Sequence, residues 1–261
     1  MSSPWRRISD KLRSLRSRSH SKLDFRESYV RRVKDLRRDH DHDEAMSLAV
    51  GGQFDAIGFL ELETLRHFGL QQNEYLIDVG CGSGRLALPL SDYLQGNYLG
   101  IDVVPDLVEH ARQIVKRPDW RFQVAAGLTI PEDPGAADMV CFFSVFTHLL
   151  HEQSYGYMEE AKRVLKPGGK IVFSFLDFSI AGHWKMFENA INDIGVNARP
   201  LSMFMSKDAI RVWAQHLGLE VVKIEDATNK YVPLSKSVTT EAGQVIQSPA
   251  SIGQSVCVLQ K

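Results

Sequence analysis

The sequence predicts an α/β protein with a doubly wound, seven-stranded and mostly parallel sheet. Three observations support this prediction. The 261 residues are 44% hydrophobic and 24% charged, which is typical of a globular protein with a sizeable core. From residue 74 onward, short apolar runs alternate with segments of helical periodicity. A glycine-rich turn follows the first of these runs, and parallel α/β sheets bind ligands at such turns.

A helical extension is expected ahead of the sheet domain. It would span residues 1–44, and the domain would span residues 45–261, with a helical insertion at about residues 178–205 after the fifth strand. Residues 1–40 contain 13 Lys and Arg against 5 Asp and Glu, so they carry +8 while the rest of the chain carries −9. The chain is therefore expected to have a basic extension on an acidic domain.

Residues 1–20 have the pattern of a basic amphipathic helix, because apolar residues recur at spacings of three and four between basic ones. Such a helix can lie on an anionic membrane surface or contact nucleic-acid phosphates. A solvated tail without a specific partner has the same pattern, so the sequence leaves these alternatives open. The apolar stripe consists of Trp5, Ile8, Leu12 and Leu15.

Three more helices are expected before the sheet. They cover residues 25–38, a segment from about residue 44, and residues 54–68, which end at Gly69. Asp41 or Asp43 is expected to cap the second of them. Histidine and acidic residues alternate from position 40 to 44, but consecutive residues of a helix do not face one point. We therefore expect no metal site and a metal-independent protein.

Apolar runs of strand length define the sheet, and helices between them indicate parallel strands covered on both faces. The strands are expected at residues 75–79, 98–101, 121–124, 139–143, 171–176, 219–224 and 255–259. Helices are expected at residues 85–94, 104–115, 153–165, 181–194 and 206–217. The link at residues 125–137 is rich in Gly and Pro and is expected to be irregular.

Composition also bears on the compartment. Cys81, Cys141 and Cys257 form no CxxC pair, and each lies in or beside an apolar run. Free buried thiols in a reducing compartment are therefore expected. No apolar run approaches the roughly 18 residues of a membrane-spanning helix, and the N-terminus lacks the apolar core of a signal peptide. We expect a cytoplasmic protein without a transmembrane segment, peripheral to the membrane if the basic helix binds lipid.

The most informative segment is the turn after the first strand. Gly80, Gly82 and Gly84 permit tight turning and let a ligand approach the backbone. A dinucleotide site has the spacing G-x-G-x-x-G, whose third glycine would fall at position 85, where this chain has Arg. Asp78 is poorly placed beside a pyrophosphate. Both features disfavour NAD and favour a ligand that carries an ammonium and a carboxylate group.

Three later motifs accompany this turn. Residues 100–102 (GID) end the second strand, residues 137–140 (ADMV) open the fourth, and residues 163–170 (RVLKPGGK) form the turn before the fifth. With residues 78–84 (DVGCGSG), they make the chain resemble the class I S-adenosylmethionine (SAM)-dependent methyltransferases. The resemblance covers residues 45–261. It implies a Rossmann-like fold whose last strand is antiparallel, SAM as the cofactor and S-adenosylhomocysteine (SAH) as its product.

The resemblance assigns the glycine turn to the methionine part of SAM. Asp78 would meet the ammonium group, directly or through water. Cys81, between the first two glycines, would contact this part of SAM together with them. The residues that would line this part of the cofactor are Gly80, Cys81, Gly82 and Gly84.

The adenosine part of SAM is assigned to residues that follow the second and third strands. Asp102 would accept hydrogen bonds from both ribose hydroxyls, and Val103 would pack on the adenine face. An Asp often binds the adenine amine after the third strand in this family, but this chain has none there. Backbone groups near Ala126 and Gly127 would take over that role, and Phe143, at the end of the fourth strand, also belongs to the expected cofactor site.

Catalytic groups are expected where the strands end. Methyl transfer depends largely on positioning, and a hydroxyl acceptor also benefits from a general base. His148 follows the fourth strand and Asp177 follows the fifth, and similar O-methyltransferases of small molecules and sugars use such a pair as base and supporting acid. The alternative is that His148 only caps a helix, while Asp177 only starts a loop. His151 is a weaker candidate.

Two regions are expected to select the acceptor. One lies before the first strand and includes Met46, Phe54 and Phe59. The other is the insertion after the fifth strand, in which Trp184 and Phe187 are favoured as core residues over acceptor contacts. The insertion's remaining candidates are His183 and Met186.

These observations favour a SAM-dependent methyltransferase that acts on a small-molecule or glycan acceptor, with oxygen as the expected methylated atom. An RNA or protein methyltransferase that holds its target with the basic N-terminus is the second hypothesis. The chain has no Asn-Pro-Pro-Tyr-like motif after the fourth strand, which argues against amine methylation of bases. A third hypothesis is a SAM-binding partner protein without catalysis. The acceptor and the oligomeric state cannot be predicted from the sequence.

Overall fold

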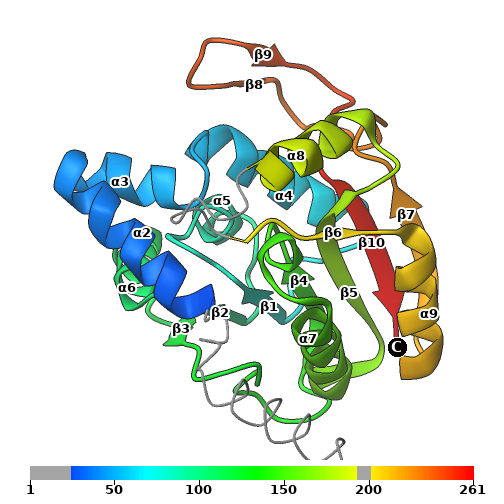
Figure 1. The fold of residues 1–261 in the computed structure, drawn as a ribbon. Coiled ribbons are helices and arrows are strands. Elements are labelled where there is room, and N and C mark those ends of the chain that lie inside the picture. Colours follow the sequence, from blue (N-terminus) through cyan, green and yellow to red (C-terminus); the bar gives the residue numbers. More distant parts are fainter. Residues whose placement is uncertain (1–24, 193–200) are drawn as a thin grey trace, which may run out of the picture.

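A computed structural model describes residues 25–192 and 201–261, so the expected amphipathic helix of residues 1–20 lies outside the described residues. The central sheet contains β1 (Leu76–Val79), β2 (Tyr98–Asp102), β3 (Arg121–Val124), β4 (Ala137–Phe142), β5 (Leu165–Asp177), β7 (Glu220–Glu225) and β10 (Ser255–Gln260). These strands lie in the order β3-β2-β1-β4-β5-β10-β7 (Figure 1). The two-residue strand β6 (Phe204–Met205) pairs with the end of β5.

The strand directions match the expected pattern. β1 to β5 run parallel to one another, whereas β10 is antiparallel to both β5 and β7. The predicted doubly wound sheet with an antiparallel last strand is therefore confirmed. β1 lies between β2 and β4, which is where the chain switches direction across the sheet. In open sheets of this kind, ligands bind beyond the carboxyl ends of the strands at that point.

Helices cover both faces of the sheet. Ile77 and Val79 belong to the apolar core beneath α7 (His151–Val164) and α9 (Lys207–Leu217). Leu76 belongs to the opposite core, beneath α4 (Phe54–His67), α5 (Ala87–Ser91) and α6 (Pro105–Val115). Because successive side chains of a strand point to opposite faces, β1 supplies both cores. Burial on both sides explains why its sequence is apolar throughout apart from Asp78.

Two helices lie outside this layer structure, on the side of the molecule away from β7 and β10 (Figure 1). They are α2 (Phe25–Asp39) and α3 (His42–Ala49). Val33 of α2, Met46 of α3 and Leu107 of α6 are buried in one apolar cluster. Asp41 caps α3 by accepting a hydrogen bond from the Glu44 N–H at 2.9 Å, as expected. The expected domain boundary after residue 44 stays a prediction, and it cuts through this packed cluster.

Two elements differ from the expectation. α5 begins only at Ala87, because Gly84 has a left-handed backbone (φ +94°) and residues 83–86 form turns. β5 begins at Leu165 instead of residue 171, so the motif of residues 166–169 lies within the strand rather than in a turn before it. A register shift against β4 absorbs that motif. The C-terminal Lys261 also hydrogen-bonds both Gly168 and Gly169.

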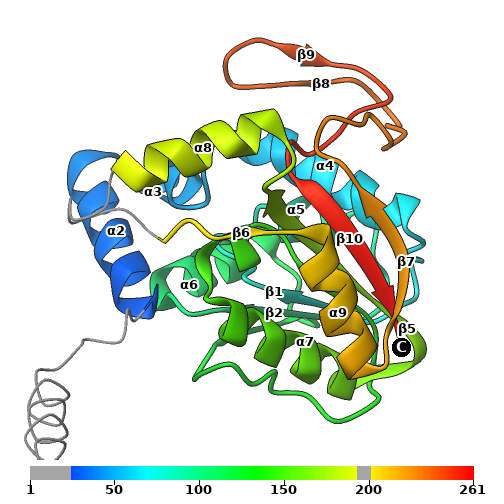
Figure 2. The same cartoon turned by 45° about the vertical axis from the view of Figure 1, so that its right-hand side comes forward.

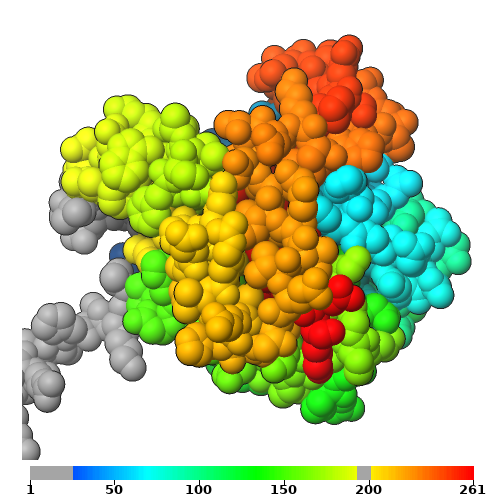
Figure 3. All heavy atoms as spheres, turned by 90° about the vertical axis from the view of Figure 1, so that its right-hand side faces the viewer, coloured from blue at the N-terminus to red at the C-terminus, as the bar shows by residue number. Residues whose placement is uncertain are grey.

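The insertion after β5 contains α8 (Ala181–Asn192), which runs above β6 in Figure 2. A hairpin that the sequence did not predict is formed by β8 (Val238–Thr239) and β9 (Val245–Ile246). Figure 3 shows it projecting above the face that α9 and β7 form. Glu241 at its turn accepts a hydrogen bond from the Phe54 N–H at 3.0 Å, so the hairpin contacts the start of α4.

The three cysteines are free and buried, as expected. Within the described part of the chain, no helix combines the length and apolar character needed to cross a membrane.

Candidate active site

The glycine turn after β1 has a backbone that only glycine accommodates easily. Gly80 and Gly82 have positive φ angles of 81° and 54°. A Cβ atom on Gly80 would lie 2.3 Å from Val145 Cγ2, and one on Gly82 would lie 2.5 Å from Val50 Cγ1. The N–H groups of Gly80 and Cys81 both donate to the carbonyl of Ile101, at 2.7 and 3.0 Å. The turn is thus fixed against β2 and leaves its surface open to a ligand.

A cavity of about 680 Å³ lies beside this turn. Its volume is in the range of pockets that hold ligands of drug size. It extends from the ends of β1 and β2 to the end of β4, and α2 and the end of α3 close it from outside. Most residues that the sequence assigned to the site line it. These are Asp78, Gly80, Cys81, Gly82, Asp102, Val103, Phe143 and His148.

Asp102, at the end of β2, hydrogen-bonds to two segments of the cavity wall. One carboxylate oxygen accepts from the Gly82 N–H at 3.0 Å, and the other accepts from the Val104 N–H at 2.9 Å. Burial raises the pKa of Asp102, and the backbone donors oppose that shift. Each oxygen keeps a second lone pair, so the carboxylate can accept two further hydrogen bonds from neighbouring hydroxyls.

Asp78 is a buried carboxylate at the floor of the cavity. Its oxygens accept from Tyr98 Oη at 2.8 Å and from Cys141 Sγ at 3.6 Å. Burial raises the pKa of Asp78 to about 7, although the Tyr98 hydrogen bond opposes the shift. A cationic group bound nearby would favour the ionised form of this carboxyl.

Three assigned cofactor residues do not line the cavity. Gly84 faces α6, where a Cβ atom would lie 3.0 Å from the Ala111 Cα, so its role is helix packing. Ala126 is exposed, and the Gly127 carbonyl accepts a hydrogen bond from Tyr157 Oη at 3.0 Å. The preceding residue, Ala125, lines the cavity instead. The chain turns away from the cavity one residue earlier than the sequence suggested.

His148 lies in a short 3₁₀ helix (Phe146–His148) at the end of β4 and lines the cavity. Its Nδ1 atom is 2.7 Å from the carbonyl of Leu201. A carbonyl can only accept, so Nδ1 carries the proton and Nε2 carries the lone pair. Within residues 25–192 and 201–261, Nε2 has no hydrogen-bond partner. Burial lowers the pKa of His148, which keeps the ring neutral at pH 7.

The expectation that Asp177 supports His148 is not met, because the Leu201 carbonyl occupies Nδ1. Asp177 does not line the cavity. One of its oxygens accepts from the Ser179 N–H at 2.9 Å, and the other lies 3.4 Å from Lys207 Nζ. Its backbone N–H donates to His183 Nδ1 at 2.9 Å. These contacts fix the end of β5 and the start of α9.

Comparisons with known proteins identify the domain. The family described as methyltransferase domain matches residues 77–173, which include both Asp78 and Asp102. One relative is the O-methyltransferase cnsE of Penicillium expansum, 24% identical over 69% of this chain and 67% of its own length. Another is a ubiquinone biosynthesis O-methyltransferase of Hydrogenovibrio crunogenus, 31% identical over 48% of this chain and 54% of its own length. The chain thus spans about two thirds of the first relative and half of the second.

A solved structure shows the same fold over almost the whole chain. Magnesium protoporphyrin IX methyltransferase from Synechocystis, with bound SAH, is 14% identical and superposes with a TM-score of 0.61. The superposition covers 92% of this chain and 100% of that one.

The chain carries a class I SAM-dependent methyltransferase domain.

The residues around the cavity of this methyltransferase fit SAM in their chemistry. The turn at Gly80 and Gly82 leaves no room for side chains but leaves its backbone accessible. Asp102 offers oxygen lone pairs that suit ribose hydroxyls, and Asp78 lies where a carboxylate can meet an ammonium group. These are the residues that would hold the cofactor.

A buried ion pair forms the wall beyond the glycine turn. Glu61 of α4 pairs with Arg85, whose guanidinium also donates to the Val50 carbonyl at 2.5 Å. Burial raises the pKa of Glu61, and the charge of Arg85 opposes that shift. The methyltransferase motifs do not include Glu61, and no sequence pattern distinguishes it from other acidic helix residues.

The sequence analysis also missed two residues of α2. Tyr29 and Arg32 both line the cavity, and the Tyr29 ring stands edge-on to the His148 ring with centroids 5.4 Å apart. Burial raises the pKa of Tyr29. Arg32 makes one long hydrogen bond, 3.5 Å to the Leu48 carbonyl. A signal was present, since Tyr29, Val33 and Leu36 are spaced as one helical stripe.

The expected acceptor residues are divided between the cavity and other places. Met186 of α8 lines the cavity, whereas Met46 is buried in the core beside α2. His183 is buried, and its Nε2 lies 3.1 Å from the Gly253 carbonyl, so both of its ring nitrogens are engaged. Trp184 is 46% exposed and contacts Phe187 at a tilted angle, in a surface aromatic cluster rather than in the core. Phe54 and Phe59 do not line the cavity either.

Proposed function

We propose that this methyltransferase transfers the methyl group of SAM to a hydroxyl oxygen of a small-molecule or glycan acceptor, with His148 as the general base. The hydrogen bond between His148 Nδ1 and the Leu201 carbonyl carries this proposal. It fixes the tautomer whose Nε2 accepts a proton and orients the ring at the cavity wall. A backbone carbonyl thus does what Asp177 was expected to do.

The protonation state of His148 suits this role. A base must be unprotonated before the reaction, and burial lowers the pKa of His148 below its ordinary value of 6.5. The ring is then ready at neutral pH to take the proton that the acceptor hydroxyl loses as its oxygen bonds to the methyl carbon. SAM supplies a methyl group on a positively charged sulfur, so the protein mainly positions the two reactants.

The walls near His148 suit a compact polar acceptor. Gln254 lines the cavity and donates to Ser144 Oγ at 3.0 Å, while its buried Oε1 has no hydrogen-bond partner among the described residues. A buried amide oxygen without a partner suits a ligand hydroxyl or amine. The two relatives described above are O-methyltransferases by name, which supports oxygen as the methylated atom.

The alternative functions have less support from the described residues. An RNA or protein acceptor was inferred from the basic N-terminus, which lies outside them. Contact of residues 1–20 with an anionic membrane or nucleic acid, and a cytoplasmic location at the membrane periphery, stay predictions. A SAM-binding protein without catalysis does not need a histidine at the cavity wall whose Nε2 lone pair is kept available.

The test compares two histidines three residues apart. His148→Gln should lower kcat by about 10²- to 10⁴-fold while SAM affinity is retained, because a general base contributes that much. His151 does not line the cavity, and its Nε2 is 3.0 Å from the Phe204 carbonyl. His151→Gln should therefore leave kcat within about twofold of the unsubstituted protein. A panel of phenols and sugars, with SAH formation as the readout, provides the acceptor for both measurements.

Each outcome bears on the proposal. Undiminished turnover in His148→Gln would remove His148 as the base. SAM binding without SAH formation from any hydroxyl compound, together with methylation of RNA or protein, would favour the second hypothesis. SAM binding without any methylation would favour the non-catalytic one.

A further inference from the structure

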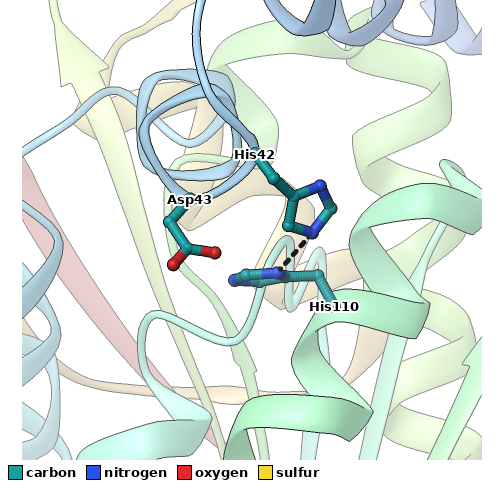
Figure 4. Close-up of side chains that lie close together, drawn as sticks. All are labelled: His42, Asp43 and His110. Carbon is teal, nitrogen blue, oxygen red and sulfur yellow. Dashed lines mark hydrogen bonds between the residues drawn. The ribbon is translucent and has the colours of Figure 1, made fainter.

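A second group of side chains lies outside the cavity, where the start of α3 meets α6. His42 and Asp43 are the first two residues of α3, and His110 lies in the middle of α6. Figure 4 shows the His42 ring and the Asp43 carboxylate both directed toward His110. The ligand atoms of the three side chains all lie within 4.8 Å of one another. The sequence analysis rejected a metal here because it considered only neighbouring residues, whereas His110 is 68 positions away from His42.

The spacing of the two imidazoles matches a metal site. His42 Nε2 and His110 Nδ1 are 3.2 Å apart. Zinc binds histidine nitrogen at about 2.0–2.1 Å in a tetrahedron, which places two ligand nitrogens about 3.3–3.4 Å apart. The imidazoles would therefore need only small shifts to share one ion. Asp43 is exposed, so its side chain can rotate closer at little cost.

We infer that His42, Asp43 and His110 bind one zinc ion, which joins α3 to α6. Two neutral imidazoles and a carboxylate form a donor set that suits zinc and neighbouring transition metals rather than magnesium or calcium. The carboxylate also offsets one of the two positive charges. A water molecule would complete the tetrahedron, because His42 and Asp43 are exposed to solvent.

The neighbouring polar side chains do not compete for the ion. Asp41 is occupied as the cap of α3, through its hydrogen bond from the Glu44 N–H. His40 lies 3.1 Å from the Glu44 carboxylate, in the link between α2 and α3 and outside the cluster. His40 is therefore a natural control, since it is a second histidine of the same segment that the geometry excludes.

The ion would join two walls of the cofactor cavity. α3 leads directly to Ala49, Val50 and Gly51, which line the cavity on the outside. α6 follows Asp102 and Val103, which line it on the ribose side. The zinc lies outside the cavity in this arrangement and takes no part in methyl transfer. Its effect would be structural: bound zinc stabilises the folded protein by mass action and keeps α3 against α6.

The experiment measures zinc binding directly in the full-length protein and needs no methyl acceptor. Its result is therefore independent of whether the proposed function is correct. Protein stripped with a chelator is titrated with zinc in competition with a chromophoric chelator. Metal content after gel filtration is determined by mass spectrometry. We expect one zinc ion per chain and a rise in Tm on zinc addition. His42→Ala and Asp43→Asn should each weaken zinc binding by at least about tenfold, whereas His40→Ala should not.

Cobalt gives an independent readout, because its visible absorption distinguishes tetrahedral from octahedral coordination. The unsubstituted protein and His40→Ala should show the tetrahedral spectrum, and His42→Ala should not. Asp43→Asn keeps the shape of the exposed side chain, so it tests the site even if His42→Ala alters the fold. Zinc binding that is equal in all four proteins, or no binding above the level of His42→Ala, would overturn the inference.

Discussion

The two ends of the cavity are built in different ways. At the cofactor end, hydrogen bonds from backbone N–H groups fix the structure. The Gly80 and Cys81 N–H groups donate to the Ile101 carbonyl, and the Gly82 and Val104 N–H groups donate to the Asp102 carboxylate. At the end near His148, where we propose that the acceptor binds, side chains from separate parts of the chain meet. The contributors there include Tyr29, His148, Met186, Ser202 and Gln254.

This difference shows which part of the site can vary. Substitutions at the cofactor end disturb the glycine turn, which is hydrogen-bonded to the end of β2. They should therefore affect SAM binding and stability together. Substitutions at the acceptor end change one wall at a time, and they should affect turnover or acceptor choice while SAM binding persists. The following predictions test that contrast, beginning with the largest effect.

Asp102→Ala should weaken SAM binding by about 10²- to 10⁴-fold. The carboxylate would lose two ribose hydrogen bonds, and bonds to charged groups contribute about 1.5–3 kcal/mol each. The substitution also leaves the Gly82 and Val104 N–H groups without their acceptor. Calorimetric titration with SAM and SAH measures the change. Unaltered affinity would show that the ribose lies elsewhere and would remove the contrast between the two ends.

Gly80→Ala and Gly127→Ala form a matched pair of glycine substitutions. A Cβ atom on Gly80 would lie 2.3 Å from Val145, and the backbone there has a φ of 81°. We expect a loss of stability of about 1–3 kcal/mol and clearly weaker SAM binding. A Cβ atom on Gly127 meets nothing within 4 Å, so stability should change by less than about 0.5 kcal/mol. Denaturant unfolding and SAM titration test both, and a marked loss of SAM binding in Gly127→Ala would restore it to the cofactor site.

SAM affinity should rise with pH up to about 7 and then level off. Burial raises the pKa of Asp78 to about 7 in the free protein, and a bound ammonium group would favour the ionised carboxylate. Binding therefore releases a proton below that pH, and affinity should change by up to about tenfold per pH unit. Titrations from about pH 5.5 to 7.5 measure the slope. The Asp78→Asn variant serves as the control and should show no such slope.

The same raised pKa has a consequence for folding. Because the folded protein holds this proton more tightly than the unfolded chain, Asp78 makes stability fall as pH rises from its ordinary pKa of 3.8 toward about 7. His148 acts in the opposite direction, since burial lowers its pKa. It makes stability fall as pH drops below 6.5, where the unfolded chain takes up the proton first.

Asp177→Asn should have the smallest effect on catalysis. Its carboxylate contacts Ser179 and Lys207 rather than His148. We expect kcat and its dependence on pH to be unchanged, with a stability loss of about 0.5–1.5 kcal/mol from the weakened contact with Lys207. A shift in the pH profile of kcat would show that Asp177 influences the base and would bring back the expected pair.

The fold was predictable because its signals are local. Apolar runs such as residues 139–142 and the glycine turn after β1 indicate strands and a ligand site without knowledge of long-range contacts. The motif of residues 166–169 misled the prediction of β5, since its turn is absorbed by a register shift and by contacts with the C-terminal Lys261. Such compensation between distant segments leaves no mark on the local sequence.

Site residues could be predicted from the sequence where the chemistry requires a particular side chain. They could not be predicted where only the position of a group in the folded protein matters. Asp102 was found because its distance from the glycine turn is characteristic. The Leu201 carbonyl that orients His148 could not be found, because every residue has a carbonyl. Tyr29 was missed because α2 was taken for part of a polar extension, and His110 was missed because only the packing of α6 against α3 brings it near His42.

Asp102 has one more consequence. Its carboxylate bridges the Gly82 and Val104 N–H groups, so hydrogen bonds within the protein join the glycine turn to the start of α6. The turn and the start of α6 are therefore preorganised, and binding requires little loss of loop entropy. Association with SAM should consequently be fast and limited by entry past α2 and α3, not by folding of the glycine turn. Dissociation of SAH, which meets the same rigid turn, should depend on the same two helices.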